Sequence, residues 1–193
     1  MYDLGIIFCI TSFFRRDTQG RRGGGVALYV KKWIDCKKLP MRNSHDQTES
    51  LWVTIRDQTN KGHLVVGVYY TLITGSLVTR SSCFSCKRCH LQALVLMGDF
   101  NHPNVCWETT QQAASNPGYS WIKDNFLVQV LNRPDRGKAL LGLVLNSAAD
   151  IIKDVKIGGS LDCSDHGVVK CVILGLAKSR VRSEILAVSA VIG

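Results

Sequence analysis

Short apolar runs, separated by polar segments that contain glycine, dominate the pattern of the chain. The clearest run covers residues 93–97 and has the length of a strand buried on both faces. Gly98 follows it, and Asp99 and Asn101 come next. We expect the strand to end at this glycine, with both polar residues at the mouth of a sheet, where sites are often built. A plain turn is the alternative, because Gly, Asp and Asn all favour turns.

The other runs predict further strands. Residues 51–56 alternate apolar and polar positions, which indicates a half-buried strand, and residues 63–70 are the returning arm of a hairpin. Residues 117–130 have apolar spacing close to that of a helix and begin after Asn-Pro. Residues 15–24 form a predicted loop or hairpin tip, and residues 31–46 a charged connection. The remaining predicted strands are residues 6–10, 26–30, 139–145, 151–157 and 168–174.

Many strands with few helices favour an α/β protein built on two packed, mostly antiparallel sheets with flanking helices. A chain of 193 residues suits one domain. We place that domain at residues 14–175. Within it, residues 71–92 form an atypical insert or loop rich in Cys and Ser. We assign residues 176–193 to a tail, of which residues 183–193 are apolar and small and have no assigned partner segment.

The chain is basic, with 24 Lys and Arg against 15 Asp and Glu and a formal net charge of +9. A basic surface suits the binding of a polyanion such as DNA. The alternative is a soluble basic protein that does not bind nucleic acid. Much of the excess lies towards the two ends of the chain, at Arg15, Arg16, Arg21, Arg22, Lys31, Lys32, Lys37, Lys38, Lys178, Arg180 and Arg182.

The eight cysteines are too dilute for a disulfide scaffold, and Cys9 and Cys171 sit in apolar runs where Cys acts as a small hydrophobe. Reduced thiols and an intracellular protein are therefore expected. No apolar run reaches the roughly 20 residues of a membrane span. The first 14 residues lack the basic start and small-residue cleavage site of a secretory signal.

Two motifs far apart in the chain belong together. Gly-Asp-Phe-Asn stands at residues 98–101, and Ser-Asp-His stands at residues 164–166 before a predicted strand. Taken alone, the Ser-Asp-His motif is equally typical of an ordinary loop. With RGGGVALYV at 22–30, ESLWV at 49–53, GVYY at 67–70, MGDFNHP at 97–103 and GGSLDCSDH at 158–166, the chain resembles the endonuclease domain of LINE-type (non-LTR, jockey-like) retrotransposons, in the endonuclease/exonuclease/phosphatase family.

The resemblance implies a four-layer α/β sandwich with its site at the sheet ends, and Mg²⁺-dependent hydrolysis of DNA phosphodiesters. It implies that Asp99 positions or activates water, and that Asn101 holds the phosphate or the transition state. Asp165 corresponds to a carboxylate near the metal, and His166 to the imidazole that contacts the phosphate or transfers a proton. Tyr70 corresponds to a tyrosine that bonds the phosphate. No membrane and no small-molecule cofactor are implied, and a functional protein would act in the nucleus.

The departures from the family predict an impaired enzyme. The opening residues lack the family's Asn-bearing strand and its metal-binding Glu, which indicates a truncated and degenerate copy, and Glu49 fits the pattern without being assigned to the metal. Gly142 stands where the family has the Asp that orients the catalytic His. In a serine-protease triad, loss of the corresponding Asp lowers the rate about 10⁴-fold. A non-catalytic remnant that binds nucleic acid weakly is the alternative.

A thiol-rich cluster within residues 71–92 offers other chemistry. Cys83, Cys86, Cys89 and His90 could chelate zinc, and Cys86-x-x-Cys89-His90 has the spacing of a c-type haem attachment site. Adjacent Cys89 and His90 are awkward as two ligands of one ion, and no axial-ligand pocket for haem is evident. A zinc-binding module at residues 83–90 and a plain thiol-rich loop both stay open.

Overall fold

The computed structural model describes eleven parts of the chain, and every structural statement below concerns them. They are residues 11–17, 25–40, 48–56, 63–71, 91–99, 122, 124–130, 142–148, 151–160, 167–174 and 182–188. The predicted strand at residues 6–10 lies outside these parts, as does the thiol-rich cluster at residues 83–90.

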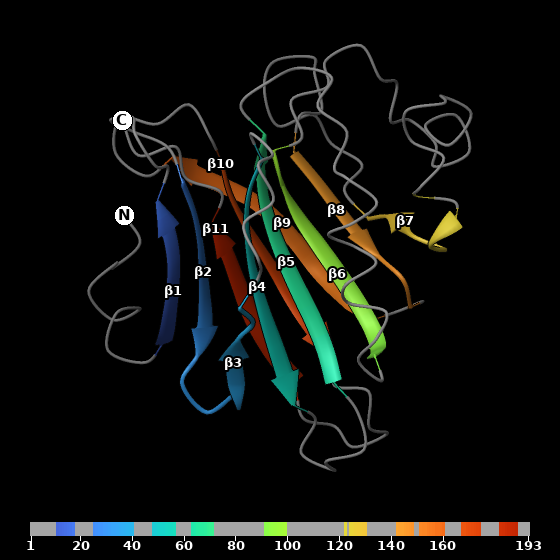
Figure 1. Cartoon of the computed structure of the whole chain (residues 1–193), viewed down its shortest axis with the longest axis horizontal. Coiled ribbons are helices and arrows are strands. Elements are labelled where there is room, and N and C mark those ends of the chain that lie inside the picture. Colours follow the sequence, from blue (N-terminus) through green and yellow to red (C-terminus); the bar gives the residue numbers. More distant parts are fainter. Residues whose placement is uncertain are drawn as a thin grey trace.

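The described strands form two sheets that face one another (Figure 1). Neighbouring strands are antiparallel except for the parallel pair β5–β6. The first sheet has the order β1 (Thr11–Asp17), β2 (Gly25–Lys31), β11 (Arg182–Val188), β10 (Gly167–Leu174) and β9 (Ile152–Ser160). The second has the order β3 (Cys36–Lys38), β4 (Thr48–Arg56), β5 (His63–Thr71), β6 (Leu91–Asp99), β8 (Gly142–Asn146) and β7 (Val128–Gln129).

The main hydrophobic core lies between the two sheets. It combines alternate residues of strands from both, because successive side chains of a strand point to opposite faces. The first sheet supplies Val26, Leu28, Val30, Val169, Cys171 and Ile173, and the second supplies Leu51, Val53, Ile55, Leu64, Val66, Val68, Val95, Met97 and Val144, among others. The predicted two packed, mostly antiparallel sheets are therefore confirmed.

The second sheet is buried on its other face as well. Trp52 is 1% exposed there and meets Tyr69 edge to face, with ring centroids 5.3 Å apart. The ring lies over Gly67, where an added Cβ would come within 2.9 Å of Trp52 and of Leu96. The strand predicted at residues 93–97 is thus buried on both faces, as expected. The strand predicted as half-buried at residues 51–56 is buried on both faces through residue 53, which corrects that prediction.

Helices are scarce in the part of the chain that is described, where only Ile122 and Asp124 are helical. The helix predicted at residues 117–130 does not reach its expected end. Phe126 has a positive φ of 55° and is followed by the short strand β7. The prediction of flanking helices in a four-layer sandwich otherwise concerns residues outside the described parts. No helix among the described residues is long and apolar enough to cross a membrane.

Three strands extend or replace predicted loops. β1 runs through Asp17 into the segment predicted as a hairpin tip, and β3 lies within the predicted charged connection of residues 31–46. β11 comes from residues 176–193, the predicted tail, and lies between β2 and β10. The segment that had no assigned partner is therefore an interior strand of the first sheet.

Gly98 does not end the strand as expected. β6 continues to Asp99, and Gly98 has a φ of +149°, which side-chain-bearing residues rarely adopt. An added Cβ would lie 2.0 Å from the Tyr69 carbonyl oxygen. Glycine is required here because the backbone of β5 approaches too closely for a side chain, and the result is that Asp99 is still part of the sheet.

Cys171 supports the assignment of cysteines as buried hydrophobes. It lies in the core, 3% exposed, and its burial raises the pKa of the thiol to about 12. The thiol is therefore protonated at neutral pH and unreactive. Cys36 is also a free thiol, so neither described cysteine forms a disulfide.

Candidate functional site at one end of the sandwich

A row of four residues crosses the second sheet at the end where the predicted site begins. Glu49 of β4 pairs in register with Tyr70 of β5, Tyr70 with Asp99 of β6, and Asp99 with Gly142 of β8. Neighbouring strands are about 4.8 Å apart, so the row spans about 14 Å. Asp99, the first residue of the sequence-predicted site, thus lies between Tyr70 and Gly142.

The first sheet ends at the same level. A hydrogen bond links the sheets, since Arg16 Nη1 in β1 donates to the Ser50 carbonyl oxygen at 2.9 Å. Ser50 is next to Glu49 in β4, so the end of β1 that carries Arg16 lies close to the row. This aligns the C-terminal end of β1 with the C-terminal ends of β5 and β6.

The register of the first sheet extends this alignment to β10. Val168 of β10 is opposite Val188 of β11, Val188 is opposite Ala27 of β2, and Ala27 is opposite Arg15 of β1. The start of β10 is therefore level with the end of β1. In Figure 1, the same upper end of the sandwich holds the ends of β5 and β6 and the starts of β8 and β10.

The predicted site residues relate to this end as follows. Asp99 and Tyr70 are within the described strands, whereas Asn101, Asp165 and His166 lie outside the described residues. Asn101 is two positions beyond the end of β6. His166 immediately precedes Gly167, the first residue of β10. The strands that flank both motifs therefore meet at one end, while the side-chain geometry of Asn101, Asp165 and His166 stays a prediction.

Tyr70 marks which side of the second sheet faces the site. Its side chain is 8% exposed and packs in the core between the sheets, with Val68 two positions before it. The row lies near the mouth of the space between the sheets, so a ligand that reaches Tyr70 must approach at this end. A contact between Tyr70 and phosphate remains a prediction.

Glu49 is the residue that the sequence interpretation set aside. It is half-buried and continues the series Leu51, Val53 and Ile55, which face the core between the sheets, so it is on the same face as Tyr70. Its two-residue spacing from Leu51 is a signal present in the sequence. The sequence predicts that this strand pairs with residues 63–70 as a hairpin, but it does not give the register that places Glu49 opposite Tyr70.

The row matches part of the donor set of a Mg²⁺ site. The ion takes oxygen ligands and is commonly held by one or two carboxylates, with water and substrate phosphate completing the shell. Glu49 and Asp99 are two acidic positions in one row. Among the described residues there is no cluster of three or more His, Cys, Asp or Glu. Asp165, which precedes β10 in the sequence and lies outside the described residues, stays a predicted ligand.

Comparison with known proteins identifies the architecture. The sequence matches no family model and no curated protein. Among solved structures, it is similar to the endonuclease domain of TRAS1, a telomere-specific non-LTR retrotransposon, with a TM-score of 0.53 and 14% identity over 92% of this chain and 78% of that chain.

A second similar structure is an endonuclease/exonuclease/phosphatase family protein from Bacteroides thetaiotaomicron, with a TM-score of 0.46 and 9% identity over 92% of this chain and 73% of that chain. The similarity to the TRAS1 domain agrees with the resemblance found in the sequence motifs. The chain has the fold of a non-LTR retrotransposon endonuclease domain.

Proposed function

We propose that the protein is a metal-dependent nuclease that hydrolyses phosphodiester bonds of DNA, at a reduced rate. One observation carries the proposal: the strands flanking the Gly-Asp-Phe-Asn and Ser-Asp-His motifs meet at the same end of the sandwich. The fold shared with the TRAS1 endonuclease domain supports it. Nicking of a chromosomal target would require the protein to act in the nucleus.

Each predicted site residue has a task in the proposed reaction. Asp99 orients a water for in-line attack on phosphorus, and Asn101 and Tyr70 hold the non-bridging oxygens. His166, with an unperturbed pKa of about 6.5, exchanges a proton with the reacting groups at neutral pH. Asp165, with a carboxylate of the row, would hold Mg²⁺. When bound, that ion neutralises charge on the phosphate and on the leaving oxygen.

One feature of the row favours a second candidate, a remnant that binds nucleic acid without cutting it. Gly142 is the register partner of Asp99. The position that would supply an orienting carboxylate for His166 therefore has no side chain, and it lies next to the proposed water-positioning residue. A histidine without such a partner loses control of its tautomer and orientation. The proposed enzyme is accordingly slow.

Nicking of supercoiled plasmid tests the proposal. We expect slow conversion to open circles with Mg²⁺, none with EDTA, and about 10²-fold less with Asp99→Ala, because proton transfer and water positioning contribute on this order. Asp124→Ala is the matched control, since Asp124 is an exposed carboxylate outside the row. Absence of metal-dependent nicking in protein that still binds DNA would establish the remnant instead.

A further inference from the structure

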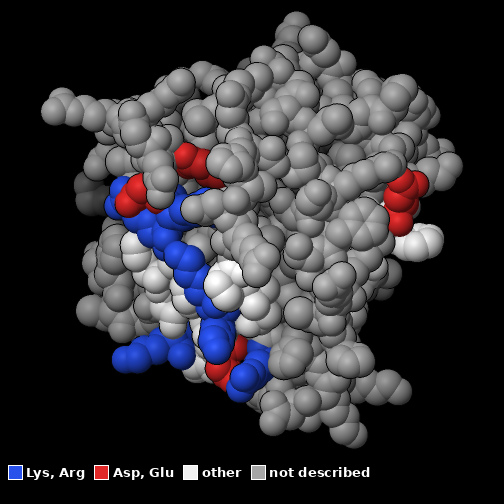
Figure 2. Space-filling view, viewed as in Figure 1, with Lys and Arg blue, Asp and Glu red and all other residues white. Residues whose placement is uncertain are grey.

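The edge strands β1 and β3 bring together basic residues that are up to about 40 positions apart in the chain. β1 is an outer strand of the first sheet and β3 an outer strand of the second. Figure 2 shows a band of Lys and Arg that descends obliquely across this side of the sandwich. We call it the basic edge, and it consists of Arg15, Arg16, Lys31, Lys32, Lys37, Lys38 and Arg56.

The two sheets are joined within the basic edge. Lys38 Nζ donates a hydrogen bond to the Arg15 carbonyl oxygen, at 3.2 Å, so a charge from β3 lies against the backbone of β1. With the bond from Arg16 to Ser50, this makes the band continuous from one sheet to the other. The band is therefore a product of the fold, and the order of basic residues in the sequence does not reveal it.

Three exposed lysines of the basic edge have no ion-pair partner among the described residues. Two of its arginines do have acidic partners. Arg15 pairs with Asp17, and Arg56 Nη1 lies 3.7 Å from Asp35 Oδ2, but both pairs are exposed and such pairs bind weakly. The exposed Lys32, Lys37 and Lys38 have no acidic partner within the described part of the chain.

We propose that the basic edge binds the phosphate backbone of duplex DNA that enters the site at the end of the sandwich. The inference rests on the proposed nuclease function, which supplies this substrate. The upper part of the edge adjoins the site, because Arg16 is bonded to Ser50, the neighbour of Glu49. β1 has seven residues and is about 20 Å long, enough to follow about six base pairs.

A competing explanation is that the charges only protect two exposed strand edges from pairing with other chains, which lysines at edges commonly do. That role predicts aggregation when the charges are removed. It predicts no change in the salt dependence of DNA binding. Each phosphate contact by a lysine contributes about 0.9 to the slope of log K against log salt concentration, so the two roles can be separated.

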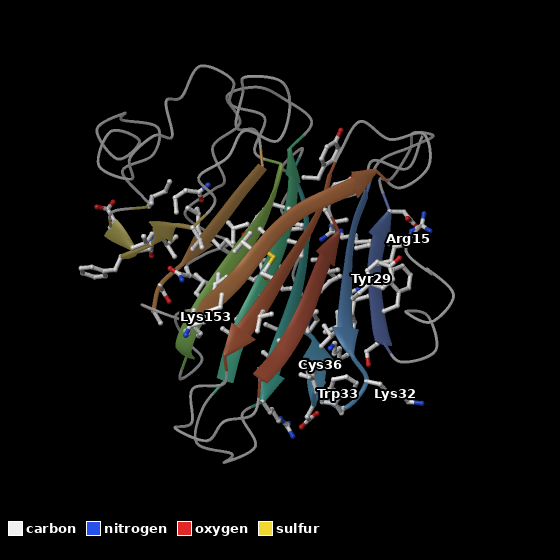
Figure 3. The ribbon with its side chains drawn as sticks, turned by 180° about the vertical axis from the view of Figure 1, so that it is seen from behind. Arg15, Tyr29, Lys32, Trp33, Cys36 and Lys153 are labelled. Atoms are coloured by element: carbon white, nitrogen blue, oxygen red, sulfur yellow. The ribbon has the colours of Figure 1, made fainter. Side chains whose placement is uncertain are left out.

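The test uses the full chain and a fluorescein-labelled 20-base-pair duplex in EDTA, with anisotropy measured from 50 to 200 mM KCl. For Lys37→Gln/Lys38→Gln we expect a slope smaller by about 1.8 and affinity about tenfold weaker at 200 mM than for the unaltered chain, independently of DNA sequence. The matched control is Lys153→Gln, an exposed lysine of β9 on the far side of the first sheet from Arg15 and Lys32 (Figure 3).

An unchanged slope in the double variant overturns the basic edge as a DNA surface, and so does an equal fall in Lys153→Gln. Aggregation of the double variant with unchanged binding establishes edge protection instead. Displacement of the duplex by polyglutamate at equal charge concentration assigns the edge to acidic peptides. Binding is measured in EDTA and so does not depend on catalysis. If the unaltered chain does not nick DNA but the double variant still has the smaller slope, only the proposed nuclease function is rejected. If the unaltered chain nicks DNA but the slope of the double variant is unchanged, only the basic edge is rejected.

Discussion

Replacing Gly142 with aspartate is expected to raise the rate of metal-dependent nicking by about 10²-fold, within the roughly 10⁴-fold that an orienting carboxylate contributes in a serine-protease triad. The register of β6 and β8 places position 142 beside Asp99, at the end of the sandwich where β10 begins. A carboxylate there would restore the partner that the proposed catalytic His166 lacks. Initial rates of plasmid relaxation at saturating Mg²⁺ measure the effect.

The control for this gain is Gly142→Asn, which has nearly the same shape as aspartate without its charge. It should leave the rate close to that of the unaltered protein. The Gly142→Asp gain should also vanish when His166 is replaced by alanine, because the new carboxylate acts through the imidazole. Equal nicking by Gly142→Asp and Gly142→Asn would contradict the assigned role of position 142.

Ending the chain after residue 181 is expected to abolish cooperative folding. β11 pairs with β10 along seven register positions and with β2 along four, so it is the strand that joins the β1–β2 hairpin to β9 and β10. Its loss leaves two strands with unpaired backbone groups, and such groups cost about 1–3 kcal/mol each when buried. Near-ultraviolet circular dichroism and thermal melting would show loss of fixed tertiary packing.

A chain that ends after residue 188 keeps all of β11 and is the matched control. It should melt within a few degrees of the unaltered protein. If the shorter chain, ending after residue 181, melts at that same temperature, β11 does not hold the first sheet together and the strand order described here is wrong.

The parts of the fold that the sequence predicts are those with a strong local pattern. Residues 26–30 and 93–97 are uninterrupted apolar runs, and residues 64–70 are apolar except for Gly67. Each of the three became a strand whose described side chains are mostly buried. The missed strands have weaker local patterns. β3 is three residues long and carries two lysines, and β11 contains Arg182 and Glu184. Both are defined by partners distant in the sequence, and no short window of residues contains that information.

Gly98 also shows that a local sequence pattern does not reveal contacts with distant residues. Glycine before Asp favours a turn locally, and the sequence therefore predicts the end of a strand. The close approach of the Tyr69 carbonyl, from a strand about 30 positions earlier, is what makes glycine necessary and keeps Asp99 in the sheet. The local signal identified the correct residue for the wrong structural reason.

Some residues of the candidate site could be predicted from the sequence, and others became evident only from the fold. The order of motifs indicated Asp99, Asn101, Asp165 and His166, because the family pattern is written in the sequence. The row of Glu49, Tyr70, Asp99 and Gly142 could be identified only from strand register, because it depends on the parallel pairing of β5 and β6 across a long connection. The basic edge could be identified only from the fold, because it depends on contact between the two sheets. Register is a property of the folded chain.

The position of a bound Mn²⁺ ion tests the central claim most directly, namely that the two motifs meet at one end of the sandwich to hold metal and phosphate. Crystals soaked in Mn²⁺ should show one anomalous peak where β5 and β6 end and β10 begins, about 2.0–2.3 Å from a carboxylate oxygen of Asp165, and Asp165→Asn should remove it. A structure with Asp99 and Asp165 at opposite ends, or with Mn²⁺ bound only elsewhere, would contradict the account.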